Sequence, residues 1–150
     1  MSEENGSPFF RLFNEIGILE QLSRTILEAR LPDGFLVSHF SVLNHLIRVK
    51  DGRTPLELAQ AFQVAKTTMS HTLAGLQKAG LVDMRAHEED GRSKRVWITE
   101  QGAAFRNQAI RSIDPEIAEL KEQFAEARVK KLLPELEALR KTMDARRDTQ

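Results

Sequence analysis

Residues 54–99 decide the fold of this chain, and they read TPLELAQAFQVAKTTMSHTLAGLQKAGLVDMRAHEEDGRSKRVWIT. Thr54 is placed as the N-cap of a helix, and Pro55 suits the first helical position because proline has no amide hydrogen to leave unpaired. Glu57 stands three residues after the cap, where its side chain completes a capping box. The stretch therefore opens with a strongly marked helix start.

A second helix is predicted over residues 66–79, after a short turn at residues 63–65. Its apolar residues Met69, Leu73 and Leu76 recur at helical spacing and predict an inner face. Gly80 is the expected stop. The opposite and flanking sides carry short polar side chains that allow close approach to base edges and phosphates, and Lys66 lies at the N-terminus, where amide groups also attract phosphate. The residues predicted to contact DNA are Lys66, Thr67, Thr68, Ser70 and His71.

A basic β-hairpin is predicted to follow, with strands over residues 81–87 and 95–98 joined at an Asp90-Gly91 turn. Arg92 is the side chain expected to enter a DNA minor groove, where negative potential is concentrated, and Asp90 is placed to orient it. Lys94 and Arg95 are expected at phosphates. The alternative is an ordinary solvated turn, which the two acidic residues before Asp90 favour.

Helices are also predicted on both sides of this stretch. Apolar spacing predicts a helix over about residues 8–30 and a second one near residues 38–49, with Ser38 as its N-cap. Thr99 is expected to cap a helix that breaks at Asp114-Pro115, and Pro134 is expected to bend the last helix. The terminal helices carry more apolar surface than a small helix-turn-helix core can cover, which predicts a symmetric dimer.

The overall composition narrows the class of protein. The chain has 150 residues, formal net charge zero and no cysteine. The absence of cysteine excludes disulfides and thiolate metal sites within this sequence and agrees with a reducing cytoplasm. No apolar run approaches the roughly 20 residues of a membrane span, and the acidic N-terminus does not resemble a secretory signal. Neutral charge with a local basic edge favours site-specific over indiscriminate DNA binding.

The run Asp90-Gly91-Arg92-Ser93-Lys94-Arg95-Val96-Trp97-Ile98-Thr99, followed by Gly102, resembles the wing of the MarR family of winged helix-turn-helix regulators. The Leu76-x-x-x-Gly80-Leu81-Val82 close of the second helix is similar to that family too. The resemblance implies a mainly α (α+β) protomer with about six helices and a two-stranded wing. It also implies a DNA-binding lobe over residues 36–99 and a dimerisation region over residues 8–30 and 100–147.

The same resemblance implies a function. Such regulators bind pseudo-palindromic double-stranded operators as homodimers, often repress, and in many cases release DNA when a small aromatic or phenolic ligand enters a crevice. By position, Arg92 matches the family's wing arginine and Asp90 its acidic partner. One departure is that residues 66–75 hold no arginine, so bidentate Arg-to-guanine contacts are not expected from this helix.

Other kinds of site are not indicated. His39 and His45 are six residues apart and do not share a helix face, so no metal site is predicted, and no cofactor is expected. No motif of an enzyme is present. Phe13 and Phe40 are candidates for lining a ligand crevice, although core positions explain them as well. The alternative function is a winged-helix module that binds protein and not DNA.

Overall fold

A computed structural model describes residues 6–86, 89 and 94–149. The chain forms two compact units, Met1–Ile113 and Asp114–Gln150. The expected fold class, mainly helical with a two-stranded antiparallel sheet, is confirmed. The described elements, in chain order, are α1 (Pro8–Glu28), α2 (Val37–Arg48), α3 (Pro55–Phe62), α4 (Lys66–Lys78), β1 (Val82–Ala86), β2 (Lys94–Ile98), α5 (Glu100–Ser112), α6 (Asp114–Gln123) and α7 (Glu126–Asp148).

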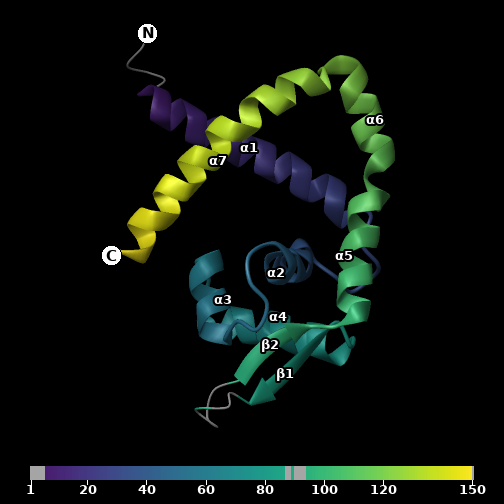
Figure 1. Ribbon diagram of the computed structural model, residues 1–150. Helices are drawn as coiled ribbons and strands as arrows, with labels where there is room; N and C mark the ends of the chain where they lie inside the picture. The colour runs from purple at the N-terminus through teal and green to yellow at the C-terminus, as the bar shows by residue number, and fades with distance from the viewer. Residues whose placement is uncertain (1–5, 87–88, 90–93, 150) are drawn as a thin grey trace. The chain divides into compact units, whose positions relative to one another are not determined.

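The first unit is built around α2. Figure 1 shows α2 nearly end-on, with α3, α4 and the hairpin gathered around it, and α2 packs against α4, α5 and β2. Its apolar core joins α2, α3, α4 and the hairpin, so the core fixes the parts of the helix-turn-helix relative to one another. The buried core residues are Val42, Leu43, Leu46, Leu58, Ala59, Met69, Leu73, Leu76, Leu81, Val82 and Val96.

The start of α2 differs from the prediction. Ser38 is not the N-cap, because the helix begins at Val37 and Leu36 takes the cap position with ψ 166°. The Leu36 N–H donates to Nδ1 of His39 at 2.9 Å, and the Val37 N–H donates to Oε1 of Glu28 at 3.2 Å. The side chains of His39 and Glu28 therefore satisfy the two amides at the start of the helix.

The start of α3 is as predicted. The Glu57 N–H donates to Oγ1 of Thr54, and the Thr54 N–H donates to Oε1 of Glu57, both at 3.1 Å. The helix ends at Phe62, and its C-cap Gln63 has a φ of 55°, in the left-handed region. This residue reverses the chain between α3 and α4, which pack against each other as a helix-turn-helix.

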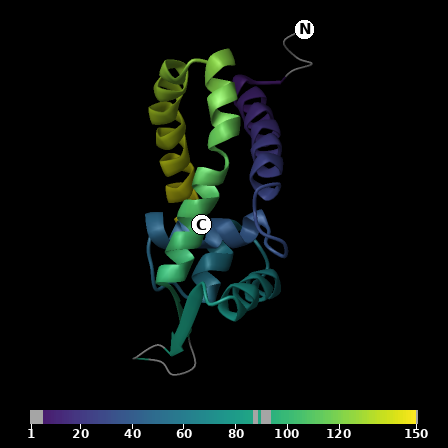
Figure 2. The ribbon, with the colours of Figure 1, turned by 90° about the vertical axis from the view of Figure 1, so that its right-hand side faces the viewer.

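The hairpin is antiparallel, with Val82 opposite Ile98 and Ala86 opposite Lys94. Figure 2 shows it extending from the rest of the first unit, at the bottom of the view. Because side chains alternate across a sheet, Val82, Met84, Val96 and Ile98 share one face, which packs on the core, while Asp83, Arg85, Arg95 and Trp97 share the other.

The helices after the hairpin follow the predicted caps and breaks. The Gly102 N–H donates to Oγ1 of Thr99 at 3.0 Å, so Thr99 caps α5 as expected. The helix ends before Asp114-Pro115, where α6 begins. A second break after Phe124, not foreseen from the sequence, separates α6 from α7, and α7 continues through Pro134. None of the helices in the described part of the chain combines the length and apolar character needed to cross a lipid bilayer.

Candidate nucleic-acid interface

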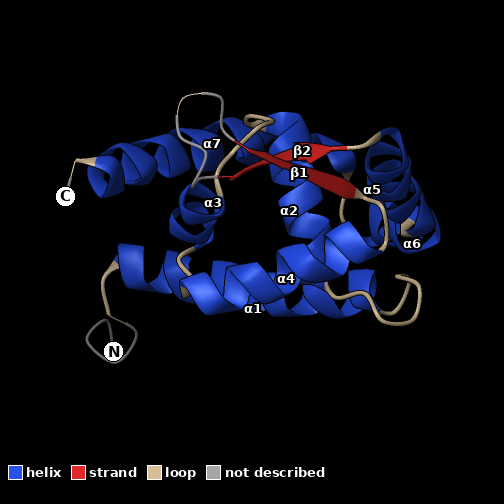
Figure 3. Ribbon diagram, turned by 90° about the horizontal axis from the view of Figure 1, so that it is seen from below, coloured by secondary structure: helices blue, strands red, loops and turns tan. Residues whose placement is uncertain are grey.

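Helix α4 exposes the polar side that the sequence predicted. Its buried residues Met69, Leu73 and Leu76 pack into the core, together with Thr72, whose hydroxyl donates to the Thr68 carbonyl. Figure 3 shows α4 along the underside of the first unit, beside the hairpin. The five predicted contact residues lie together along the exposed side of this helix: Lys66, Thr67, Thr68, Ser70 and His71.

The inner side of α4 meets His39 of α2. An ideal Cβ built on Gly75 would lie 3.1 Å from Nε2 of His39, so the missing side chain of Gly75 makes room for the imidazole. Burial lowers the pKa of His39 below its ordinary value and the positive charge of His71 lowers it further, against a smaller opposing effect of the hydrogen bond with the Leu36 backbone. His39 has no role predicted from the sequence, because nothing in its spacing shows that α2 and α4 bring His39 and Gly75 together.

The described strands of the hairpin carry three basic side chains. Lys94 is exposed at the start of β2, and Arg95 is half-buried with its Nη1 donating to the Gly52 carbonyl at 3.0 Å. Arg85 on β1 lies directly opposite Arg95, on the same face. Its guanidinium is 3.9 Å from the Asp83 carboxylate and 5.5 Å from the Trp97 ring centroid.

Arg85 is a basic residue that sequence reasoning missed. Alternation along β1 predicts its face, but only the register with β2 shows that it stands beside Arg95. The other two hairpin residues singled out from the sequence, Asp90 and Arg92, lie outside the described residues, and so does the Asp90-Gly91 turn.

The base of the hairpin is tied to the turn between α2 and α3. Oδ1 of Asp51 accepts from the Gly52 and Ile98 amides, both at 3.0 Å. The Val96 N–H donates to the Arg53 carbonyl at 2.7 Å, and the Gly52 N–H donates to the Val96 carbonyl at 3.0 Å. This turn therefore pairs with β2 through an isolated antiparallel bridge between Arg53 and Val96.

Gly52 has a φ of 71°, and a Cβ there would lie 2.6 Å from the Trp97 ring. Glycine is required at this turn both by the backbone conformation and by the close approach of the indole. The side of the hairpin base that carries Arg85 and Arg95 is held in place by this contact.

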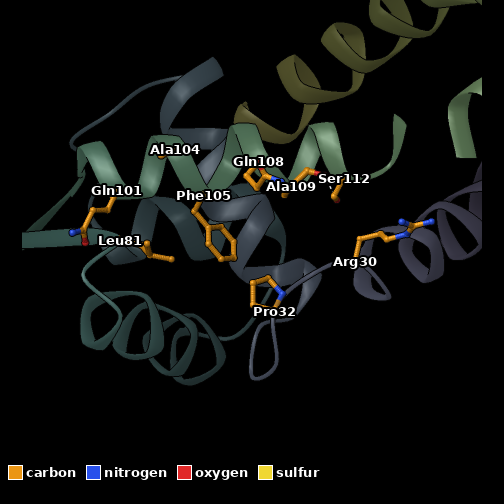
Figure 4. A pocket seen from close by; sticks show the side chains of 9 residues that line it. All are labelled: Arg30, Pro32, Leu81, Gln101, Ala104, Phe105, Gln108, Ala109 and Ser112. Atoms are coloured by element: carbon orange, nitrogen blue, oxygen red, sulfur yellow. Dashed lines mark hydrogen bonds between the residues drawn. The ribbon is translucent and has the colours of Figure 1, made fainter. Parts of the chain in front are cut away.

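A pocket of about 560 Å³ lies within the first unit (Figure 4). The Phe105 ring extends from α5 toward Pro32, and Leu81, Ala104 and Ala109 complete an apolar lining. Its polar lining residues are Arg30, Gln101, Gln108 and Ser112. Neither predicted crevice residue lines it: Phe13 is 44% exposed on α1, and Phe40 is half-buried in α2.

Within residues 6–86, 89 and 94–149, no three side chains among His, Cys, Asp and Glu gather as a metal site would require. His39 and His71 approach one another, but they come from different helices and have no carboxylate partner with them in such a cluster. The described interface is therefore made of hydroxyls, imidazole and basic side chains.

A helix-turn-helix followed by a hairpin whose base is bonded to the turn between α2 and α3 defines a winged helix-turn-helix protein. A model of the MarR family matches residues 33–93. The HTH-type transcriptional repressor YetL of Bacillus subtilis (strain 168) is 32% identical over 94 residues, which are 62% of this chain. The matched stretch covers 56% of that relative. Over this stretch the chain is similar to the MarR family of regulators.

Solved structures show the same fold. A crystal structure of MarR is similar with a TM-score of 0.81 at 19% identity, covering 93% of this chain and 95% of the other. BldR from Sulfolobus solfataricus has a TM-score of 0.75 at 21% identity, with 95% and 99% covered. A mutant MarR from E. coli complexed with operator DNA has a TM-score of 0.67 at 23% identity, with 89% and 99% covered. The relatives are described as regulators or repressors of transcription, not as enzymes.

Proposed function

We propose that this chain is a sequence-specific DNA-binding regulator of transcription, acting as a repressor at a pseudo-palindromic operator. The observation that carries the proposal is the exposed polar side of α4 standing next to the basic strands of the hairpin. This arrangement suits a helix in the major groove and a hairpin over the neighbouring backbone and minor groove.

The chemistry of α4 favours a particular kind of readout. Thr67, Thr68 and Ser70 offer hydroxyls on short side chains, and His71 offers an imidazole one turn further along. Lys66 and the first amides of the helix suit a phosphate. Because no arginine stands on residues 66–75, sequence selection would rest on hydroxyl and water-mediated contacts and on DNA shape.

The hairpin supplies the positive charge. Lys94 is exposed and Arg85 adds a second exposed cation, so both suit phosphate contacts. Arg95 is bound to the Gly52 carbonyl, which gives it a part in the hairpin base in addition to the proposed phosphate contact. Arg92, oriented by Asp90, is proposed for the minor groove on the resemblance to the MarR wing.

A homodimer is proposed from the apolar surface of the terminal helices, which would form the dimerisation region, with residues 36–99 as the DNA-binding lobe. Helix α1 has no buried residue, and its Leu19 and Leu22 are 61% and 60% exposed. In the second unit, Leu120 and Leu132 are also more than half exposed. Two such protomers would place their α4 helices roughly 34 Å apart, one turn of DNA.

Regulation by a small aromatic or phenolic ligand is a further part of the proposal. The pocket below α5 has an apolar floor that suits a flat ring, and amide and guanidinium groups at its edge that suit a polar substituent. A ligand that binds the DNA-free state better than the DNA-bound state would release the operator.

The test begins with selection of bound fragments from the source genome and measurement of affinity for the selected site. Arg92→Ala should weaken specific binding by about 1–3 kcal/mol, the range of a good groove contact. Lys94→Ala should weaken binding to all sequences and lower the salt slope by about one. Lys141→Ala removes an exposed lysine of α7 that is not among the proposed DNA contacts, and it serves as the control once light scattering shows that its oligomeric state is unchanged.

Two outcomes would contradict the proposal. Unchanged affinity of Arg92→Ala for the selected site would contradict the proposal that Arg92 enters the minor groove. Failure to enrich any DNA, together with capture of the chain by a protein partner through the same face, would favour the alternative of a protein-binding winged-helix module.

A further inference from the structure

The imidazole of His39 joins two helices through its two nitrogens. Nδ1 accepts the Leu36 N–H at the start of α2, and Nε2 faces Gly75 in the middle of α4. A backbone amide can only donate, so Nδ1 must be unprotonated and the hydrogen of the neutral ring must be on Nε2, toward α4.

Two described neighbours pack against the ring. Phe35 packs edge-on against His39 with ring centroids 5.5 Å apart, and Phe35 in turn lies 4.7 Å from Phe105 of α5. Gly75 lies next to Nε2, where an ideal Cβ would be only 3.1 Å away. A displacement of the ring toward Gly75 therefore has to be shared with α4.

Two ionisable groups from other elements belong to this environment. His71 of α4 stands one turn before Gly75 and acts on His39 through its charge. Glu28, from the last turn of α1, accepts the Val37 N–H beside Leu36. The third neighbouring element, α5, contributes the uncharged ring of Phe105 through Phe35.

We propose that His39 is a positioning residue for α4: its neutral imidazole sets the position of the recognition helix through Gly75, and protonation of His39 weakens specific DNA binding. The proposal rests on the proposed function for its DNA readout. It concerns the support beneath α4 and not a group that touches DNA.

The physical reason lies in the bonding of Nδ1. A proton there would face the Leu36 N–H, so two donors would oppose each other where a 2.9 Å hydrogen bond now stands. A second positive charge would also stand near His71 in a partly buried place. Because burial and His71 lower the pKa of His39, the unfolded chain takes up this proton at higher pH than the folded chain. This contribution to stability is therefore present above about 6.5 and is lost as the pH falls below it.

The experiment measures affinity for the selected operator from about pH 7.5 to about pH 5.5, on either side of the ordinary histidine pKa. Glutamine is the usual partner of an N-cap amide at this helix position and does not titrate, so His39→Gln is the matched variant. Both proteins carry His71→Gln, so that any difference between their pH profiles reports on His39 and not on the second imidazole. His39→Ala, which removes the acceptor, is the third variant.

We expect the protein with His39 to lose about threefold to tenfold more affinity on acidification than the His39→Gln variant, the size expected for one capping bond. His39→Ala should bind more weakly at high pH, and His39→Gln should restore most of that loss. Equal pH profiles for the proteins with and without His39→Gln would overturn the proposal.

A readout without DNA separates this proposal from the proposed function. In an NMR titration of the free protein, the Leu36 and Gly75 amide signals should shift together with the His39 ring, and the His39→Gln variant should abolish both shifts. If the chain binds no DNA but these signals move together, the proposed function fails and the positioning of α4 by His39 stands. A Gly75 amide signal that does not shift together with the His39 ring would overturn the proposal that His39 positions α4.

Discussion

Oδ1 of Asp51 accepts the backbone N–H of Ile98 at 3.0 Å, across 47 residues of sequence. The same oxygen accepts the Gly52 N–H. This carboxylate therefore joins the turn between α2 and α3 to the end of β2. In the MarR fold of this chain, the orientation of the hairpin depends on a residue that lies outside the hairpin.

Asp51→Ala should destabilise the fold by about 1–3 kcal/mol, because two amides lose a charged acceptor. Asp51→Asn keeps an oxygen in the same place and should cost clearly less. Urea unfolding followed by circular dichroism measures both. Equal losses of unfolding free energy in the two variants would show that the acceptor bonds contribute nothing and that only the loss of the charge lowers stability.

Gly102→Ala should destabilise the protein although alanine is the better helix former. A Cβ at this buried position in the first turn of α5 would lie 2.1 Å from the Leu81 carbonyl oxygen and 2.8 Å from Cγ1 of Ile98. The clash should cost about 1–3 kcal/mol. Thermal unfolding measures it, with Ala104→Gly, at an exposed position of α5 that lines the pocket, as the control for helix propensity, about 1 kcal/mol. A higher melting temperature for Gly102→Ala would contradict the close packing.

Stability should depend on the Glu57 carboxylate in a pH range set by its pKa. The Thr54 amide and hydroxyl and the Arg53 guanidinium lower the pKa of Glu57 below 4.5 in the fold, against a smaller opposing effect of burial. In this range the unfolded chain binds more protons than the folded chain. The stabilisation is thus complete above about 4.5 and is lost as the pH falls through the lower folded pKa.

The comparison for this prediction is Glu57→Gln, which keeps an acceptor for the Thr54 amide but does not titrate. The free energy of unfolding of the two proteins should differ most near neutral pH and converge in acid. A difference that stays constant with pH would show that the charge on Glu57 does not strengthen the cap.

The exposed apolar side of α1 should be required for self-association. Leu19→Glu with Leu22→Glu places two charges in the surface that the proposed dimer would bury, so light scattering should show a monomer at micromolar concentration. Asn14→Glu adds a charge to the same helix without removing an apolar side chain. A dimer that survives the double change, or a wild-type chain that is monomeric, would contradict the proposed role of α1.

Local signals in the sequence predicted the elements well. Thr54 with Glu57, Thr99 with Gly102, and Gly80 after α4 mark helix ends through bonds and backbone conformations that involve residues close in sequence. Ser38 failed as a cap for the opposite reason. The amides at the start of α2 are satisfied by His39 and by Glu28, and Glu28 comes from another helix, so residue type alone did not reveal the partner.

Some residues of the candidate interface could be predicted from local sequence, and others could not. The exposed side of α4 follows from its helical period, and Lys94 follows from the basic run before Val96. The pairing of Arg85 with Arg95 needed the register of the hairpin, and the bond from Arg95 to Gly52 needed the turn after α2 to reach β2.

The amino-acid order alone determined the helix-turn-helix, its caps and the basic hairpin, because periodicity and capping act over a few residues. Only the tertiary structure decided what supports them. The contact of His39 with Gly75 and the bond of Asp51 with Ile98 each join segments more than 30 residues apart. Such contacts exist only once burial of the shared core has brought α2, α4 and β2 together, and no local pattern records which side chains will then meet.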